Sequence, residues 1–367
     1  AWVIVFGIMS QMRTKYICVG EGIYESRSNL FMAIMAFSII IFFAGMRSYV
    51  ADTSAYINTF NQYPLFSAAH DVIFDSSARE PGFIVFSILI KTYISQDYQV
   101  WLFIIATISG VCIMYPLYKY SCNYGISLFL FMTSCQFTWM FNGMRQFLVA
   151  SILFACTPFI LEKKPIPYII IVLILSTFHK SALIMIPAYF IVDSEPWSKR
   201  SMLFIACIIL AMMFTSKFTG LLDTVVENSD YATSIGEFKD SDDGTSPIRI
   251  LVESIPIIIA FIYRDRIKEK LTPIIKISIN MSLISSGVYI ISKIAKSGVL
   301  LGRLPIYFSL YNLLLLPWLI NNTFEKNERR LINFFMIICY LGFFYYQMKI
   351  AWNGFGYISS ILKINAK

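Results

Sequence analysis

The segment YIIIVLILSTFHKSALIMIPAYFIV, residues 168–192, decides how this chain crosses a membrane. It is long enough for one spanning helix, which needs about 20 apolar residues. However, His179 and Lys180 lie at its centre, where a charged side chain costs about 3 kcal/mol or more. The segment is therefore either one span with a costly charge inside it or two short helices that meet at His179.

The whole chain has the composition of a polytopic membrane protein. Of its 367 residues, 57% are hydrophobic and 14% are charged, whereas a soluble domain carries about 25% charged residues. We attribute the net charge of +8 to cationic helix ends and an anionic lipid substrate rather than to nucleic acid. The seven cysteines are scattered without a CxxC pair, so we expect packing residues, not disulfides or metal ligands.

Apolar runs long enough for helices recur along the chain, with clusters of Lys and Arg in the short loops between them. The positive-inside rule places such short basic loops in the cytoplasm. We therefore expect a single all-α transmembrane domain over residues 1–367, with about twelve transmembrane helices. The runs are 1–12, 30–46, 98–118, 125–142, 146–161, 166–178, 180–192, 201–216, 248–263, 273–292, 299–320 and 331–348.

Two basic pairs, at 163–164 and 199–200, indicate whether residues 166–192 form one span or a helical hairpin. One span would put these pairs on opposite sides of the membrane, whereas a helical hairpin keeps both in the cytoplasm. Each arm of the hairpin has about 13 residues and reaches ~20 Å, less than the ~30 Å hydrocarbon core. We therefore predict a short hairpin whose tip, at His179, faces outward from a protein-lined cavity.

Two further segments are predicted to lie outside the cytoplasm. Residues 80–95, EPGFIVFSILIKTYIS, are short, and counting them as a span would invert the sidedness of everything that follows. We read them as a helix lying in the outer interface, within one extracytoplasmic loop over residues 47–97. A second extracytoplasmic loop, residues 221–247, is strongly acidic.

Under this topology, several charged or polar side chains collect at the outer surface, mostly at the ends of apolar runs. For any single arginine the alternative is snorkelling to lipid head groups. As a set, the arginines favour a phosphate-bearing group that enters from the membrane, because guanidinium forks match phosphate oxygens. The set comprises Arg47, Asp52, Arg79, Glu80, Arg145, Gln146, His179, Lys180, Arg249, Glu253 and Arg303, while Lys91, Lys293 and Lys296 are read as interfacial anchors.

Several kinds of site are not indicated by the sequence. It has no P-loop, no GxGxxG followed by an acidic residue, no GxSxG elbow and no His/Cys cluster. The carboxylates of DSDDG, residues 240–244, lack the spacing of a calcium loop and are read as a solvated loop. We therefore expect neither a cofactor nor a metal.

The ordered motifs resemble the EpsG/Wzy-like family of bacterial polysaccharide polymerases. In sequence order they are MRSYVADTSAY (46–56), REPGF (79–83), NGMRQ (142–146), FHKSAL (178–183) and GRLPIYF (302–308). The resemblance implies a GT-C-like fold in the bacterial inner membrane that polymerises oligosaccharide repeat units carried on undecaprenyl diphosphate at the outer leaflet. The family pattern often has an Asp-Tyr pair in the first motif, whereas here Thr53 follows Asp52.

Site roles follow as a hypothesis from the chemistry that the resemblance implies. Glycosyl transfer needs a base for the attacking hydroxyl and positive charge for the departing diphosphate. Glu80, Asp52 and His179 are the candidate bases, although Glu80 could instead be a helix-start carboxylate beside Pro81 and His179 a hinge residue or a donor to the diphosphate. The candidate diphosphate ligands are Arg47, Arg145, Gln146, Lys180, Arg249 and Arg303.

Three other functions compete with this one. A structural assembly subunit without chemistry would leave the costly buried charges unexplained. A lipid-linked oligosaccharide flippase or transporter would also need a basic cavity, but internal repeats are not visible. An integral membrane glycan acyltransferase could use His179 as a base, but its donor would have to arrive from the cytoplasm. For a polymerase, the expected partners are the lipid-linked repeat units, membrane lipids, and flippase and chain-length regulator proteins.

Overall fold

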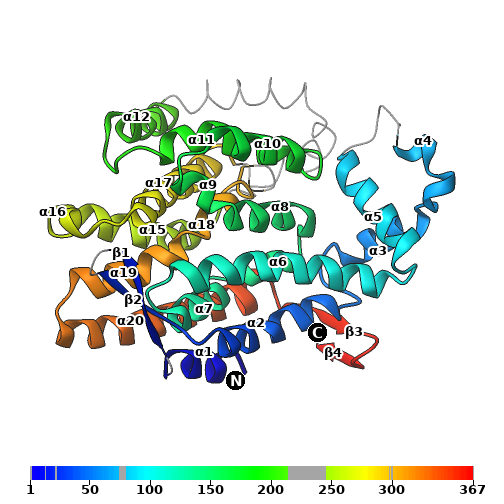
Figure 1. Ribbon diagram of the computed structural model, residues 1–367, viewed down its shortest axis with the longest axis horizontal. Helices are drawn as coiled ribbons and strands as arrows, with labels where there is room; N and C mark the ends of the chain where they lie inside the picture. The colour runs from blue at the N-terminus through cyan, green and yellow to red at the C-terminus, as the bar shows by residue number, and fades with distance from the viewer. Residues whose placement is uncertain are drawn as a thin grey trace. The chain divides into compact units, whose positions relative to one another are not determined.

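A computed structural model describes residues 2–12, 14–20, 23–73, 80–213, 245–296, 298 and 301–366. The structure is 77% helical, so the predicted all-α class is confirmed. Contacts divide the chain into two compact units: unit 1 comprises Ala1–Pro187 and Phe324–Lys367, and unit 2 comprises Ala188–Thr323. Figure 1 labels the helices and strands along the chain. Arg79 and residues 214–244, which include most of the predicted acidic loop, lie outside the described residues.

The long helix α6 (Tyr98–Tyr120) is the centre of unit 1. It packs against α2 (Leu30–Gly45) and α8 (Met144–Ala155), and α1 (Trp2–Met12) lies against α2 and α7 (Tyr124–Thr133). These helices coincide with runs of apolar sequence, because apolar side chains all around a helix suit burial on one face and lipid on the other. A hairpin of β1 (Lys15–Gly20) and β2 (Ile23–Arg27) connects α1 to α2.

The predicted outer loop, residues 47–97, contains helices that pack on α6. Its elements are α3 (Thr53–Gln62), the 3-10 helix η1 (Phe66–Ala68), α4 (His70–Ile73) and α5 (Pro81–Tyr93). Phe60 of α3 stacks on Trp101 of α6 with ring centroids 4.7 Å apart, and the Trp101 indole donates to Ser87 of α5 at 3.2 Å. Each buried aromatic side chain contributes roughly 1.5–3 kcal/mol, so α3 and α5 are fixed against α6.

The segment around His179 is not one continuous helix. The short helix α9 (Thr157–Leu161) is followed by α10 (Pro165–Ser176), which ends before His179. His179 itself is extended, with φ −155° and ψ 114°. A 3-10 helix, η3 (Lys180–Ile184), then packs back on α10 and leads into α11 (Met185–Val192). The break therefore lies where the sequence predicts it. The outward orientation of the tip stays a prediction.

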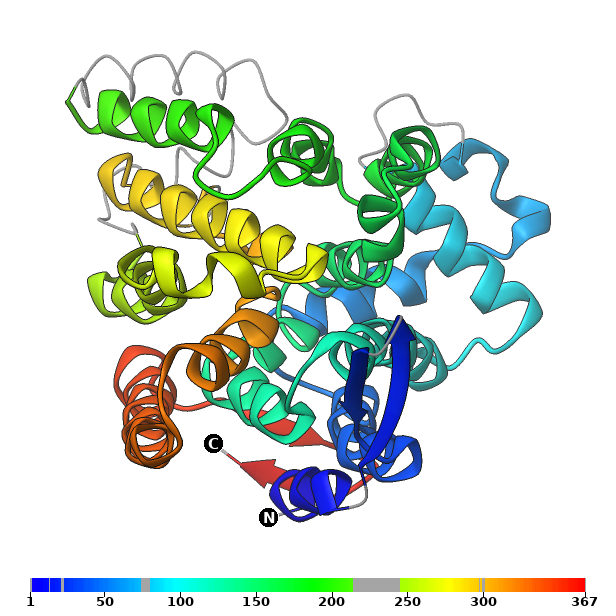
Figure 2. The ribbon, with the colours of Figure 1, turned by 60° about the vertical axis from the view of Figure 1, so that its left-hand side comes forward.

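The C-terminal part of unit 1 pairs with the chain directly after α2. After α20 (Lys326–Tyr345) and the π-helical turn η5 (Tyr346–Ala351), β3 (Tyr357–Ser359) and β4 (Ile364–Ala366) form a hairpin (Figure 2). Ile358 exchanges backbone hydrogen bonds with Tyr49 at 3.0 and 3.1 Å, and the Tyr357 hydroxyl donates to the Phe43 carbonyl at 3.0 Å. This pairing was not predicted from the sequence.

Unit 2 is a helical bundle around α17 (Pro273–Ile294), which packs on α12, α15, α18 and α19. Its core contains Ile257, Leu283 and Trp318. Asn280 of α17 donates to the backbone oxygen of Ser194 at 2.7 Å, which ties the buried helix to the preceding loop. The other elements of the unit are α12 (Lys199–Met213), α15 (Pro247–Ile262), α16 (Arg264–Ile267), η4 (Lys268–Lys270), α18 (Ile306–Ser309) and α19 (Asn312–Thr323).

Three described helices are long and apolar enough to cross a membrane: Tyr98–Tyr120, Pro273–Ile294 and Lys326–Ala351. Six shorter apolar helices, of 10–17 residues, accompany them within the described residues. These helices are compatible with a polytopic membrane protein. The count of twelve spans stays a prediction.

Lys91, predicted to be an interfacial anchor, holds the end of α3. Its Nζ donates to the backbone oxygens of Phe60, Asn61 and Tyr63 at 3.0, 2.8 and 2.6 Å. The last carbonyls of a helix have no partner within the helix and carry partial negative charge, so a lysine there is stabilising.

We expect Lys91→Met to loosen α3, because it removes three charge-assisted hydrogen bonds at little change in side-chain volume. The free energy of local opening should fall by about 2 kcal/mol, which makes amide exchange of α3 about 30-fold faster. Hydrogen–deuterium exchange on the protein in detergent micelles measures this. Lys268→Met, at an exposed lysine of unit 2, is the control; equal α3 exchange in both variants would contradict the role of Lys91.

Candidate functional site

Glu80 precedes α5 in a strained backbone conformation. Its φ of 61° and ψ of 58° lie in the left-handed region, which costs an L-residue roughly 1–2 kcal/mol. The side chain makes no capping hydrogen bond to the helix and is only 6% exposed. Glu80 is thus not a conventional helix-start carboxylate, and its strain is of the kind found at functional sites.

Gly82 docks the start of α5 onto the end of α10. Its amide donates to the Thr177 carbonyl at 2.9 Å. A Cβ atom at this position would lie 2.1 Å from the Thr177 hydroxyl and 2.9 Å from the Phe178 ring, so only glycine fits. This close approach brings Glu80 next to the helix break that carries His179.

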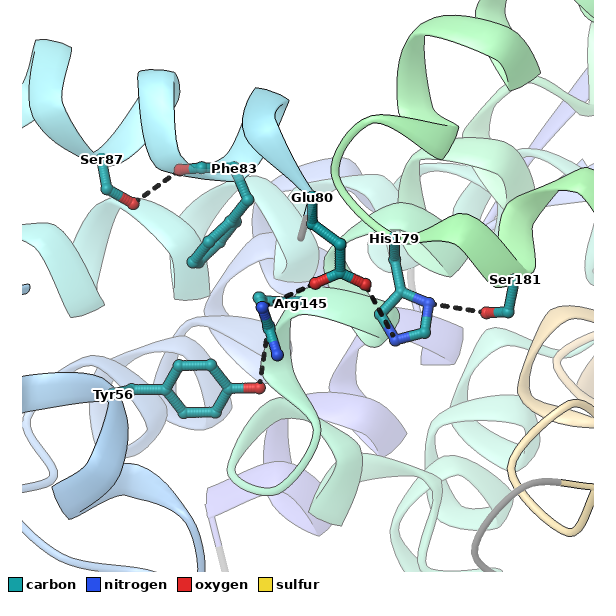
Figure 3. Close-up of polar contacts among 7 residues, drawn as sticks. All are labelled: Tyr56, Glu80, Phe83, Ser87, Arg145, His179 and Ser181. Atoms are coloured by element: carbon teal, nitrogen blue, oxygen red, sulfur yellow. Dashed lines mark hydrogen bonds and ion pairs between the residues drawn. The ribbon is translucent and has the colours of Figure 1, made fainter. Parts of the chain in front are cut away.

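The Glu80 carboxylate joins side chains from three separate elements (Figure 3). Arg145, in the first turn of α8, places Nη1 2.6 Å from Glu80 Oε2. His179, before η3, places Nε2 3.6 Å from Glu80 Oε1. Arg145 is the most open of the three, with 35% of its side chain exposed against 16% for His179. We call these three residues, with Tyr56, Gln146 and Ser181, the Glu80 cluster.

The second ring nitrogen of His179 is fixed by a hydrogen-bond chain. His179 Nδ1 lies 2.7 Å from Ser181 Oγ, and that oxygen accepts from Gln146 Nε2 at 3.1 Å. Because Gln146 supplies a donor to Ser181, the hydroxyl can give its own proton to Nδ1, which leaves the proton of a neutral imidazole on Nε2, facing Glu80. Ser181 was not predicted as a site residue from the sequence, although it lies two residues after His179 in the quoted motif.

Tyr56 of α3 orients the Arg145 guanidinium. Arg145 Nε donates to the Tyr56 hydroxyl at 3.2 Å, and the guanidinium carbon lies 5.3 Å from the centre of the Tyr56 ring and 5.8 Å from that of Phe83. Burial raises the pKa of Tyr56 above its usual value, so the phenol is neutral. Tyr56 was not predicted as a site residue from the sequence; its position four residues after Asp52 on a helix was the available signal.

Asp52 fixes the loop that precedes Arg145. Its Oδ2 accepts the backbone amide of Gly143 at 3.1 Å. Gly143 has a φ of +71° and is the last residue before α8, so glycine is favoured there because side chains disfavour the left-handed region. The contact joins the motif at 46–56 to the motif at 142–146. The role of Asp52 as a base stays a prediction.

Arg47 lies inside the protein. It is 1% exposed; its Nε donates to Thr53 Oγ1 at 3.0 Å, Nη1 donates to the Ala44 carbonyl, and Nη2 lies 3.1 Å from Met144 Sδ. Its guanidinium thus links the end of α2 to the start of α3 and to α8. Lys180, by contrast, is exposed at the first position of η3.

The remaining predicted residues belong to unit 2. Arg249 and Glu253 lie one turn apart on α15, and Glu253 is 3% exposed and accepts from Asn312 Nδ2 at 3.1 Å. Arg303 is half-buried in the turn before α18. Among the described residues, no group of three or more His, Cys, Asp or Glu side chains could hold a metal ion.

Comparison with known proteins adds one match. A family model described as the EpsG family matches residues 30–358. No curated protein matches the chain, and no solved structure matches it. The matched range extends from the start of α2 to β3, so it contains the whole Glu80 cluster.

We expect Gly82→Ala to undock α5 from α10, because the added methyl group would overlap the Thr177 side chain. Overpacking of this kind costs about 1–3 kcal/mol, so the Gly82 amide and its neighbours should exchange hydrogen faster by about tenfold or more. Hydrogen–deuterium exchange of the peptide that covers residues 81–93 measures the effect.

Two variants control this experiment. Gly342→Ala adds the same methyl group to a helix where nothing lies within 4 Å, and it should stabilise α20 by about 1 kcal/mol. Thr177→Gly in the Gly82→Ala background removes the nearest obstructing atoms and should restore part of the protection. Unchanged exchange in Gly82→Ala would show that the close approach does not hold α5.

Proposed function

The chain belongs to the EpsG family, and on this premise we propose that it is a membrane polysaccharide polymerase. It transfers a glycan from undecaprenyl diphosphate to a hydroxyl of another lipid-linked repeat unit and forms a glycosidic bond. The observation that carries the proposal is the Glu80 cluster, in which a buried carboxylate, an arginine and a histidine from three elements meet. A carboxylate and a cation side by side are what glycosyl transfer from a diphosphate requires.

In this proposal Arg145 binds the departing diphosphate. It is more exposed than Glu80 and His179, and its guanidinium can contact phosphate oxygens through two parallel N–H groups. Bond breaking leaves both electrons of the anomeric C–O bond on the diphosphate. The guanidinium stabilises this negative charge, which grows towards the transition state.

Glu80 is the base in the proposed mechanism. The acceptor hydroxyl attacks the anomeric carbon and gives its proton to the Glu80 carboxylate. His179 is less suited because its ring nitrogens already face Ser181 and Glu80, and Asp52 holds the Gly143 amide. When the diphosphate draws the Arg145 guanidinium towards itself, Glu80 loses part of its neutralising partner, so its proton affinity rises.

The other predicted ligands contribute differently in this proposal. Gln146 acts through Ser181 on the orientation of His179. Lys180, Arg249 and Arg303 remain candidate contacts of the diphosphate or the lipid surface. Arg47 supports the framework, because its donors are directed at protein atoms.

The proposed setting is the outer leaflet of the bacterial inner membrane. Residues 47–97 form the extracytoplasmic loop, α5 lies in the interface, the 166–192 segment opens outward, and the whole chain is a GT-C-like domain of about twelve spans. The apolar helices and the family support this membrane setting. Flippase and chain-length regulator proteins are the proposed partners, and undecaprenyl-diphosphate-linked repeat units are both donor and acceptor.

We expect Arg145→Ala to lower polymerisation about 10²–10³-fold, because one transition-state charge contact is lost. Arg145→Lys should restore only part of it, since an ammonium lacks the planar fork. The measurement is the length distribution of surface glycan in a deletion strain complemented with each variant, with protein amount in the membrane checked by immunoblot. Arg266→Ala, at an exposed arginine of α16, is the matched control.

The same measurement of surface glycan length distinguishes the competing functions. Glycan of one or a few repeat units supports a polymerase. Absence of surface glycan would favour a flippase, and normal length with altered decoration would favour an acyltransferase. Normal glycan length in Arg145→Ala would remove Arg145 from the diphosphate site.

We expect Glu80→Gln to reduce turnover about 10²–10⁴-fold while donor binding is retained, because the amide keeps the shape of the carboxylate but cannot accept the proton. His179→Gln and Asp52→Asn should lower turnover less. Steady-state polymerisation and donor binding by the purified protein in micelles measure the two effects separately. A larger loss of turnover in His179→Gln than in Glu80→Gln would transfer the role of base to His179.

A further inference from the structure

The Tyr56 hydroxyl has a proton that none of the described residues accepts. Its oxygen accepts from Arg145 Nε at 3.2 Å, so one lone pair is occupied and the hydroxyl's own proton must point elsewhere. Among the described residues, no carbonyl, carboxylate or hydroxyl accepts that proton. A phenol is thus left with an unused donor directly beside a guanidinium.

The chemistry of this phenol suits a donor and not a base. Burial raises the pKa of Tyr56, with the Arg145 charge acting in the opposite direction, so the proton stays on the oxygen at neutral pH. The side chain is half-buried and lies against Arg145, the most open charged member of the cluster. An anion bound to the Arg145 guanidinium would therefore lie close to this hydroxyl, because the two groups are 3.2 Å apart.

The Tyr56 hydroxyl is not needed to hold α3 in place. The start of α3 is tied to the Gly143 amide through Asp52, and its end is held by Lys91. The Tyr56 ring packs in the same cluster as Phe60 and Phe83, and a phenylalanine would keep that packing. The stability of α3 therefore does not explain the presence of the hydroxyl group.

We propose that Tyr56 is a second ligand of the lipid-linked diphosphate, whose hydroxyl donates to a phosphate oxygen held by Arg145. This inference rests on the proposed function and adds to it a residue that contacts the substrate. Arg145 provides charge and Tyr56 provides a neutral, directed donor. Together they bind an oxyanion from two sides, and the Nε–H···O bond between them keeps both donors aimed at the same point.

Binding of geranylgeranyl diphosphate to the full-length protein in micelles tests the proposal. Because a hydrogen bond to a charged group is lost, Tyr56→Phe should weaken binding by about tenfold. Geranylgeraniol, which lacks the phosphates, should bind equally to both proteins. Tyr98→Phe removes a hydroxyl from another tyrosine of the same aromatic cluster and should bind the diphosphate as the unmodified protein does.

A double variant separates a direct contact from an effect through Arg145. In Arg145→Lys the Nε–H that Tyr56 accepts is absent, so a hydroxyl that only orients the guanidinium has nothing left to orient. The proposal requires that Tyr56→Phe still weakens diphosphate binding by about tenfold in the Arg145→Lys background. No further loss in that background would make Tyr56 a positioning residue and overturn the direct contact. Thermal unfolding of each variant confirms that the protein is folded.

The outcomes also distinguish this inference from the proposed function. If Arg145→Ala loses diphosphate binding and Tyr56→Phe keeps it, Tyr56 is not a ligand although the diphosphate site stands. If Arg145→Ala also binds the diphosphate normally, the diphosphate site itself is wrong, and with it the role of Tyr56.

Discussion

The charge on the Glu80 carboxylate is the constraint on which the arrangement of unit 1 depends. A buried carboxylate is costly unless a positive partner and hydrogen bonds lie beside it. Arg145 provides the partner from α8, and His179 provides a second group from the break before η3. The start of α5, the start of α8 and the break before η3 must therefore meet at one point. Displacement of any of the three would leave a buried charge without its partner.

The backbone around Glu80 explains why the residues of EPGF occur in this order. Glu80 takes the left-handed conformation, and its carboxylate lies against Arg145 and His179 (Figure 3). Pro81 begins the helix, where its missing N–H is not needed. Gly82 permits the contact with Thr177, and Phe83 packs in the core beside Trp101. The local strain at Glu80 is offset by this packing, because α5 is fixed at both its start and its buried face.

Much of the helical framework could be predicted from the sequence, because apolar runs and the charges that interrupt them are local signals. The break at His179 was predicted for the same reason. The contact of Asp52 with Gly143 and the three bonds of Lys91 could not be predicted, since they join residues far apart in the chain. An arginine at the end of an apolar run looks the same in the sequence whether its side chain is buried or partly exposed. Arg47 is buried and Arg145 is partly exposed, and only their tertiary contacts show this difference.

The pairing of β3 with the chain after α2 makes the order of synthesis matter. Ser48 and Ser360, whose hydroxyls lie 2.7 Å apart, are 312 positions apart in the sequence. At about 5–20 residues per second, the ribosome needs roughly 15–60 s to make the intervening chain. During that time Tyr49 lacks its partner strand, so the turn that carries Arg47 and leads into α3 is completed only when the C-terminal strands emerge. A segment made later thereby completes the support of a part of the site that was made earlier.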